Sequence, residues 1–233
     1  MTLTTIERPW ESMYSGYRRI FWGILLLLIQ IEIGPIPILQ IFAGYLLIAS
    51  GISCMKRVAV TRNLIRAFRV ANIMLIGSLL DFMLRFLESN TGFFVPRPYM
   101  ALLSGVMMTF LIRGLELLLF YDILSTSSKI LRFNNDFSLA DDTDKRLRMF
   151  LVAQTILSIT TLLLFLLPYL SLFLFPNFFF PIFGFIIVIF ISWIVMKIWL
   201  ASVFARLKRR YGQPDSTFTR KTDEYQVELS INE

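Results

Sequence analysis

Long apolar runs alternate with short polar stretches along this chain of 233 residues. A helix needs roughly 20 apolar residues to cross the ~30 Å hydrocarbon core of a membrane. Because that core holds no water, a spanning segment must satisfy its own backbone hydrogen bonds, as an α-helix does. The pattern therefore predicts an all-α fold, a polytopic membrane helix bundle.

Six transmembrane helices in three consecutive hairpins are predicted. The first apolar run, residues 20–55, is too long for one span and is interrupted by Pro35 and Pro37, which remove backbone donors and end a helix. It is interpreted as two spans joined by a tight turn, with a re-entrant hairpin as the alternative. The predicted spans are 20–34, 36–55, 70–87, 99–124, 149–175 and 178–204.

The basic residues predict the orientation of the spans. Of the 23 Lys and Arg residues, 19 fall before span 1, between spans 2 and 3, between spans 4 and 5, or after span 6. Arg97 alone lies on the opposite side, and Arg85, Arg113 and Lys197 lie within spans. Loops rich in Lys and Arg stay on the cytoplasmic side. Both termini are therefore expected to be cytoplasmic (N-in, C-in).

Residues outside the spans form two further segments. Residues 1–19 are predicted to be a cytoplasmic interfacial helix, because aromatic and Met side chains recur there at helical spacing. Residues 205–233 are predicted to be a basic juxtamembrane segment followed by a flexible tail. The side chains of the interfacial face are Trp10, Met13, Tyr14, Tyr17 and Phe21.

Basic residues beside the spans indicate a surface for anionic lipid headgroups or a protein partner. The net charge of +7 is assigned to this membrane role and not to nucleic acid, because the charges flank apolar spans. The alternative is that they only set the topology. The residues of this predicted surface are Arg62, Arg66, Arg69, Arg206, Lys208, Arg209 and Arg210.

Ionisable residues inside the spans form the main candidate site. Each charge costs about 2.5–3.5 kcal/mol at the centre of a span on insertion scales, so such residues are expected to face the bundle interior and to pair. Asp81 and Arg113 are expected to meet near the midplane. Lys197 is expected to reach the cytoplasmic interface with its long stem, without a function. The cluster, interpreted as either a binding site or a structural set of ion pairs, is Asp81, Arg85, Arg113, Glu116 and Glu32.

The residue inventory argues against several kinds of chemistry. The chain has no His and one Cys, Cys54, so it cannot form an internal disulfide or a His/Cys metal site. Four aspartates, Asp136, Asp141, Asp142 and Asp144, could bind Ca²⁺, but their spacing is not that of an EF-hand and they are interpreted as helix caps. No catalytic residue, metal or cofactor is predicted.

Residues 34–48, GPIPILQIFAGYLLI, resemble a segment of uncharacterised small multispanning membrane proteins of Gram-positive bacteria. In that family an Ile/Leu-rich turn leads into Phe-x-Gly-Tyr and an apolar span, and Phe42, Gly44 and Tyr45 match this pattern. The resemblance implies membrane topology and a bacterial source, and it implies no activity.

Three functions remain open from the sequence. The first is a non-catalytic integral membrane subunit that acts with a partner in transport, peptide immunity or signalling. The second is a transporter or permease in its own right, with the charged residues of spans 3 and 4 lining a polar path. A lipid-modifying membrane enzyme is least favoured, because no nucleophile lies beside a base. The expected location is the bacterial cytoplasmic membrane, with multiple spans, contacts to lipid, and a protein partner or a homo-oligomer.

Overall fold

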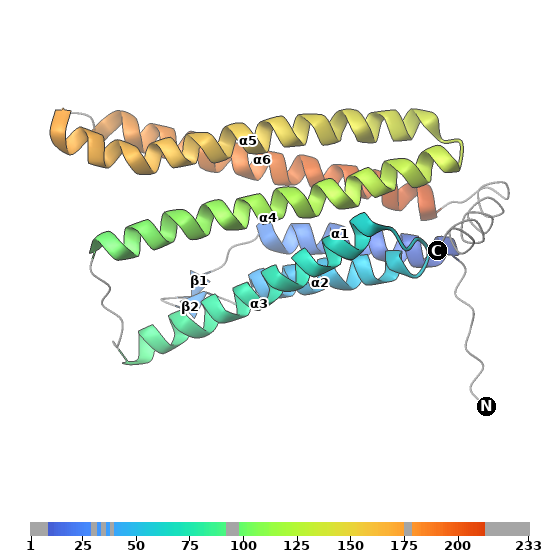
Figure 1. Ribbon diagram of the computed structural model, residues 1–233, viewed down its shortest axis with the longest axis horizontal. Coiled ribbons are helices and arrows are strands. Elements are labelled where there is room, and N and C mark those ends of the chain that lie inside the picture. The colour runs from blue at the N-terminus through green and yellow to red at the C-terminus, as the bar shows by residue number, and fades with distance from the viewer. Residues whose placement is uncertain are drawn as a thin grey trace.

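A computed structural model describes the backbone of residues 9–28, 32–33, 36–37, 40–91, 98–174 and 179–212, and the side chains of 10–28, 41–83, 110–161, 163 and 187–212. Within these residues the fold consists of six helices and one pair of two-residue strands (Figure 1). The all-α class predicted from the apolar pattern is confirmed for them. The elements are α1 (Pro9–Leu28), β1 (Glu32–Ile33), β2 (Ile36–Pro37), α2 (Gln40–Lys56), α3 (Arg62–Thr91), α4 (Pro98–Phe133), α5 (Phe137–Leu174) and α6 (Phe179–Gly212).

The helices pack as a closed ring in chain order. Each helix contacts the next one in sequence, and α6 packs back against α1. In Figure 1, α5 and α6 lie on one side of α4, and α1, α2 and α3 lie on the other. Side chains of α4 also contact α1, α2 and α6. The two halves of the bundle therefore meet both through α4 and where α6 packs against α1.

Four glycines hold α1 and α2 in backbone contact. A Cβ atom on Gly16 would lie 2.9 Å from the carbonyl oxygen of Gly51, and one on Gly51 would lie 2.7 Å from that of Gly16. The pair Gly23 and Gly44 repeats this arrangement, with distances of 2.7 and 3.1 Å. In both helices the glycines are seven residues apart, so they recur on one helical face. Small residues at such a seam let two helices approach more closely than any side chain would permit.

A short antiparallel ladder reverses the chain between α1 and α2. Glu32 pairs with Pro37 and Ile33 with Ile36. The reversal predicted from the prolines is therefore confirmed, and α1 and α2 form a hairpin.

The N-terminal helix differs from the sequence prediction. Helix α1 runs without a break across the predicted boundary between residues 19 and 20. The side chains assigned to an interfacial face point into the bundle, with Met13 and Tyr17 fully buried and Trp10, Tyr14 and Phe21 partly buried. The spacing correctly predicted that these side chains share one face of a helix. That face packs against α6 and not against the membrane interface.

The turn between α4 and α5 is set by a Schellman motif. The backbone N–H of Asp136 donates to the carbonyl of Leu131 at 2.9 Å, and that of Asn135 donates to the carbonyl of Arg132 at 3.0 Å. Asn135 has a φ of 60°, the left-handed conformation that closes such a helix end and that Asn tolerates. The polar segment between the predicted spans 99–124 and 149–175 is almost entirely helical. Helix α4 continues past residue 124, and α5 begins well before residue 149.

Two helical segments, Arg62–Met83 and Ile187–Gly212, are long and apolar enough to cross a membrane, and Ile41–Lys56 is a shorter apolar helix, when only the described side chains are considered. Exposed large apolar side chains nevertheless occur on all six helices.

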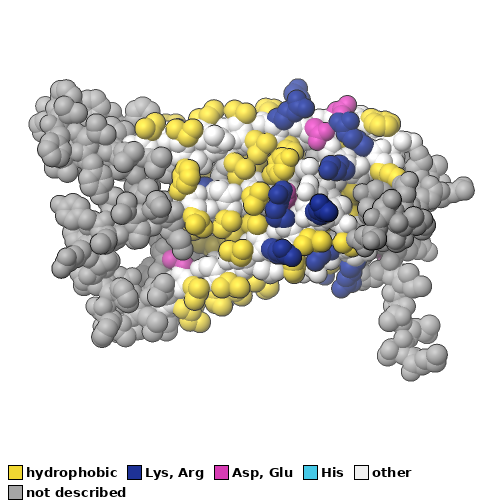
Figure 2. Space-filling view, in the orientation of Figure 1, with side chains coloured by type: hydrophobic (Ala, Val, Ile, Leu, Met, Phe, Trp, Pro, Cys, Tyr) yellow, Lys and Arg dark blue, Asp and Glu magenta, His cyan; other side chains and the backbone are white. Residues whose placement is uncertain are grey.

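Figure 2 shows them over the middle of the bundle, with Lys and Arg gathered toward one end. We call the end formed by residues 10–19, 56–69, 125–148 and 205–212 the basic end. One exposed apolar residue from each helix is Trp22, Leu46, Ile76, Phe110, Val152 and Val188.

The glycine seam predicts a difference between two Gly→Ala substitutions. Gly51→Ala should lower the stability of the folded protein by about 1–3 kcal/mol, the usual cost of inserting a methyl into a filled space. Gly77→Ala should be neutral or stabilising, because nothing lies within 4 Å of its Cβ position and Ala is the better helix former. The melting temperatures of both variants, purified in detergent, are measured by monitoring thermal unfolding with size-exclusion chromatography. Equal melting temperatures for the two variants would show that the α1–α2 backbones are not in contact.

Candidate functional site

A buried carboxylate, Glu116, lies at the centre of the bundle and is 5% exposed. The Lys197 ammonium donates to its Oε1 atom at 2.7 Å, and the Tyr45 hydroxyl donates to the same oxygen at 3.0 Å. The Arg113 guanidinium lies 3.7 Å from the other oxygen, Oε2. The cluster therefore joins α2, α4 and α6. We call these four residues the Glu116 centre.

The Lys197 side chain is buried between aromatic rings. It is 1% exposed, and its ammonium lies 5.3 Å from the centroid of the Phe120 ring and 5.7 Å from that of Trp193. The Arg113 guanidinium carbon lies 5.2 Å from the same Trp193 centroid. Aromatic faces stabilise cations by the ring quadrupole, more strongly where water is excluded. Trp193 is thus shared by both cations of the site.

The Glu116 centre carries one more positive than negative charge, because Lys197 and Arg113 face a single carboxylate. Burying an ion costs several kcal/mol, and a partner charge with good geometry offsets that cost. Lys197 supplies this geometry for Glu116. Arg113 does not, since 3.7 Å exceeds the length of a hydrogen bond. Among the described residues, Glu116 at this distance is the ion-pair partner of Arg113.

The five predicted site residues fall into three groups. Arg113 and Glu116 come together, as neighbours one turn apart on α4. Asp81 lies exposed on α3, and its predicted pairing with Arg113 stays a prediction. The side chains of Arg85 and Glu32 lie outside the described residues.

The expectation for Lys197 was wrong. Its side chain does not extend to the edge of the bundle but turns inward to Glu116. Sequence spacing alone does not reveal how a helix is rotated about its axis, so it could not distinguish these orientations. The one sequence cue is Trp193, a turn away, which places an aromatic face beside the Lys197 stem.

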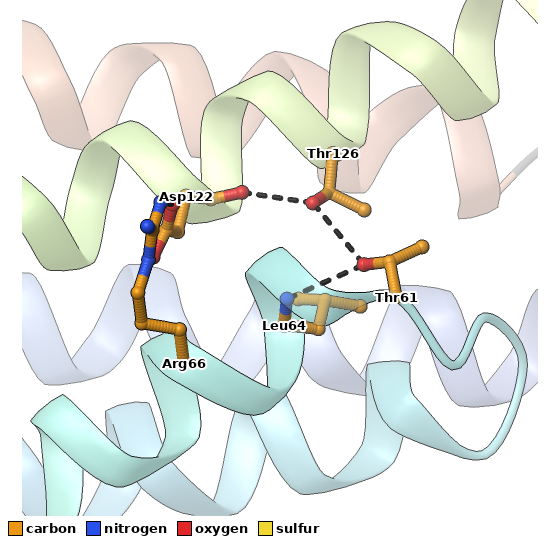
Figure 3. A network of polar contacts seen from close by, with 5 residues as sticks. All are labelled: Thr61, Leu64, Arg66, Asp122 and Thr126. Carbon is orange, nitrogen blue, oxygen red and sulfur yellow. Dashed lines mark hydrogen bonds and ion pairs between the residues drawn. The ribbon is translucent and has the colours of Figure 1, made fainter.

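The predicted basic surface is partly used for internal ion pairs. Arg66 forms a two-point contact with Asp122, with Nε 2.7 Å from Oδ2 and Nη2 against Oδ1. The hydrogen bonds and charge of Asp122 raise the pKa of Arg66. In Figure 3 this pair lies beside a chain of hydroxyl contacts, in which Thr126 donates to the Asp122 carbonyl and lies 3.5 Å from the Thr61 hydroxyl. Thr61 also accepts from the Leu64 N–H and caps α3.

Other basic residues divide between pairs and exposed positions. Arg206 donates to Asp142 at 3.1 Å and Arg210 to Asp136 at 2.7 Å, while Lys208 lies 4.9 Å from the ring centroid of Phe21. Arg62, Arg69 and Arg209 are exposed at the basic end, and so are the paired residues Arg66 and Arg206.

The aspartates of α5 bind arginines. Arg132 donates to Asp141 and to Asp144, each at 2.8 Å, and Arg146 donates to Asp142 at 2.8 Å. Among the described residues no group of three metal-ligating side chains occurs. The capping interpretation fits Asp136, which directly precedes α5, but not the three aspartates inside the helix.

Tyr17 forms a second buried contact between helices, at the basic end. Its hydroxyl donates to Ser127 of α4 at 2.7 Å, and its ring lies 5.2 Å from that of Tyr211 in α6, centroid to centroid. Burial raises the pKa of both tyrosines, so their hydroxyls stay protonated. The aromatic spacing predicted Tyr17 at a membrane interface, and it gives no signal for the contact with Ser127 because that residue lies on another helix.

The buried pair predicts non-additive effects on folding. Lys197→Met should destabilise the protein by about 3–5 kcal/mol, because it leaves the Glu116 charge without its main partner. The double variant Glu116→Gln/Lys197→Met should recover most of the folded yield. Arg132→Gln, which breaks half-exposed pairs only, is the control and should cost about 1 kcal/mol or less. Monodisperse yield and melting temperature measure all three, and a Lys197→Met variant as stable as Arg132→Gln would contradict the buried pairing.

No protein-family model matches the chain, and no significant match was found among curated proteins or solved structures.

Proposed function

We propose that the chain is a multi-pass protein of the bacterial cytoplasmic membrane, with six spans in three hairpins and both termini in the cytoplasm. Exposed apolar side chains on all six helices support this, because a water-soluble bundle would place polar residues on its outer faces. The position of the basic end supports the orientation. It gathers Lys and Arg where the α2–α3 and α4–α5 connections lie, as the positive-inside rule requires of cytoplasmic loops.

The proposed activity is transport of a small charged solute, with the Glu116 centre as its binding site. The observation that carries this proposal is a buried group of ionisable residues enclosed by three helices. Glu116 lies eight residues before Leu124 and hence about 12 Å inside the predicted span boundary. Ionisable side chains at such a depth are characteristic of substrate and ion pathways.

The charges of the site favour transport over a purely structural role. Glu116 and Lys197 would suffice for an ion pair between α4 and α6. Arg113 adds a second cation, which is 29% exposed, stacks on Trp193 and is not within hydrogen-bond length of Glu116. A surplus charge without a close partner is costly in an apolar layer unless an anion occupies the site for part of the time.

A second candidate is a non-catalytic membrane subunit that docks a soluble partner at the basic end. Helices α4 and α5 continue beyond the predicted spans, and ion pairs of Arg132, Arg146 and Arg206 brace these extensions. Phe137, at the start of α5, is 56% exposed there and offers an apolar contact among charges. A braced helical extension is a suitable platform for a partner protein.

Transport is tested by reconstituting the full chain in proteoliposomes and recording charge movement after jumps in acetate, lactate, chloride or phosphate. At least one anion should evoke a current from wild type and from Arg132→Gln. The double variant Glu116→Gln/Lys197→Met should fold but give a current at least tenfold smaller. Absence of current from wild type with all four anions, or an undiminished current from the double variant, would overturn the proposal.

Partner docking is tested by affinity purification from the native host after mild solubilisation. The candidate predicts one soluble protein in a fixed ratio to the chain. Phe137→Ser should lose that protein, and Met149→Ser, which alters an exposed apolar residue at the start of the predicted span, should retain it. Loss in both variants or in neither would count against a docking site at Phe137.

A further inference from the structure

Gln154 of α5 is a buried amide with no hydrogen bond to any described residue. The side chain is 1% exposed, and both its Nε2 and Oε1 atoms lack a partner. A buried amide whose hydrogen bonds are not made costs about 1–3 kcal/mol for each polar group. A side chain of this kind in an apolar bundle is expected only where something else completes its hydrogen bonds.

The packing of α4 and α5 places Gln154 level with Glu116. The rings of Phe120 and Phe150 meet at a centroid distance of 5.9 Å. Glu116 lies one turn before Phe120, and Gln154 lies one turn after Phe150. Since the two helices are antiparallel neighbours, both steps lead to the same level of the bundle.

The packing of α5 and α6 places Gln154 level with Trp193 as well. Arg146 of α5 lies over the ring of Trp199 in α6, with its guanidinium carbon 5.7 Å from the centroid. About two turns further along α5 is Gln154, and about two turns back along α6 is Trp193. The indole N–H of Trp193 is buried and, like the Gln154 amide, has no acceptor among the described residues.

We propose that Gln154 and Trp193 form a subsite of the Glu116 centre that binds a small organic monoanion carrying a hydrogen-bond donor, such as a hydroxycarboxylate. The carboxylate accepts hydrogen bonds from the Gln154 amide N–H and the Trp193 indole N–H, and Arg113 supplies the balancing charge. The hydroxyl of the ligand donates to Gln154 Oε1. This inference rests on the proposed function and names its substrate class.

The charge of the centre selects an anion over a cation. Two cations and one carboxylate leave the site positive, so a cationic ligand would be repelled. A neutral ligand would leave Arg113 without an anion. Chloride fits less well, because it has no hydrogen-bond donor for the Oε1 atom of Gln154, which lacks a partner among the described residues.

Ligand binding is tested on the full chain in lipid nanodiscs, with lactate, acetate, chloride and choline as probes. Lactate should raise the melting temperature and change the tryptophan fluorescence, and acetate, which lacks the hydroxyl, should bind at least threefold more weakly. Chloride and choline should have no effect. The inference is overturned if lactate has no effect or if choline matches it.

Substitutions at the subsite separate ligand binding from folding. Gln154→Leu removes only unpaired polar atoms, so the protein should fold as well as wild type while its affinity for lactate falls at least tenfold. Trp193→Phe keeps an aromatic ring and removes the N–H, so it should also weaken lactate binding. For this variant, binding is measured as the rise in melting temperature that lactate causes. The control is Thr155→Val, an exposed polar-to-apolar change on the same helix, which should bind lactate as wild type does. Unchanged lactate affinity in Gln154→Leu would overturn the subsite.

These experiments can contradict the subsite without contradicting transport, and transport without contradicting the subsite. Lactate binding that depends on Gln154, without any current in proteoliposomes, leaves the subsite standing and overturns transport. An anion current that is the same in wild type and Gln154→Leu leaves transport standing and overturns the subsite.

Discussion

The carboxylate of Glu116 is the constraint around which the bundle is organised. A charge buried in an apolar interior must be met by partners, and the partners of Glu116 come from other hairpins. Tyr45 belongs to the α1–α2 hairpin and Lys197 to the α5–α6 hairpin, while Glu116 and Arg113 belong to the hairpin between them. One side chain thus links all three hairpins, and removing it would affect contacts on α2, α4 and α6 together.

Different interactions hold the rest of the bundle. Along α1 and α2 the contact is backbone against backbone, and the four glycines give it its closeness. At the basic end the contacts are polar, with Tyr17 joining α1 to α4 and Arg66 joining α3 to α4. Helix α4 takes part in both polar contacts and in the Glu116 centre. A central helix with so many polar contacts is well suited to keep a buried site in place while the outer helices face an apolar surrounding.

The polar groups of the interior divide into a satisfied and an unsatisfied set. Glu116, Lys197 and Tyr45 satisfy one another at hydrogen-bond distances. Gln154 and the Trp193 N–H, at the same level, do not have partners among the described residues. The unsatisfied groups of Gln154 and Trp193, together with the surplus charge of Arg113, are the groups to which a ligand would bind. They are the reason for favouring a transport role over ion pairs that only lock helices together.

The sequence alone determined the helical class, the number and order of the helices and the reversal at Pro35 and Pro37, because apolar composition and missing backbone donors act locally. It also placed Arg113 and Glu116 among the charges expected to face the bundle interior. Tertiary structure decided which partners they meet, since that depends on how each helix is rotated and how its neighbours are aligned. Lys197 turned inward, Tyr17 became buried and Gln154 came level with Glu116 only because α4, α5 and α6 pack side by side. The polar stretches beyond the spans are helical, and ion pairs connect them across α4, α5 and α6. The pairs of Arg206 with Asp142 and of Arg210 with Asp136 join residues far apart in the chain, which the sequence does not reveal.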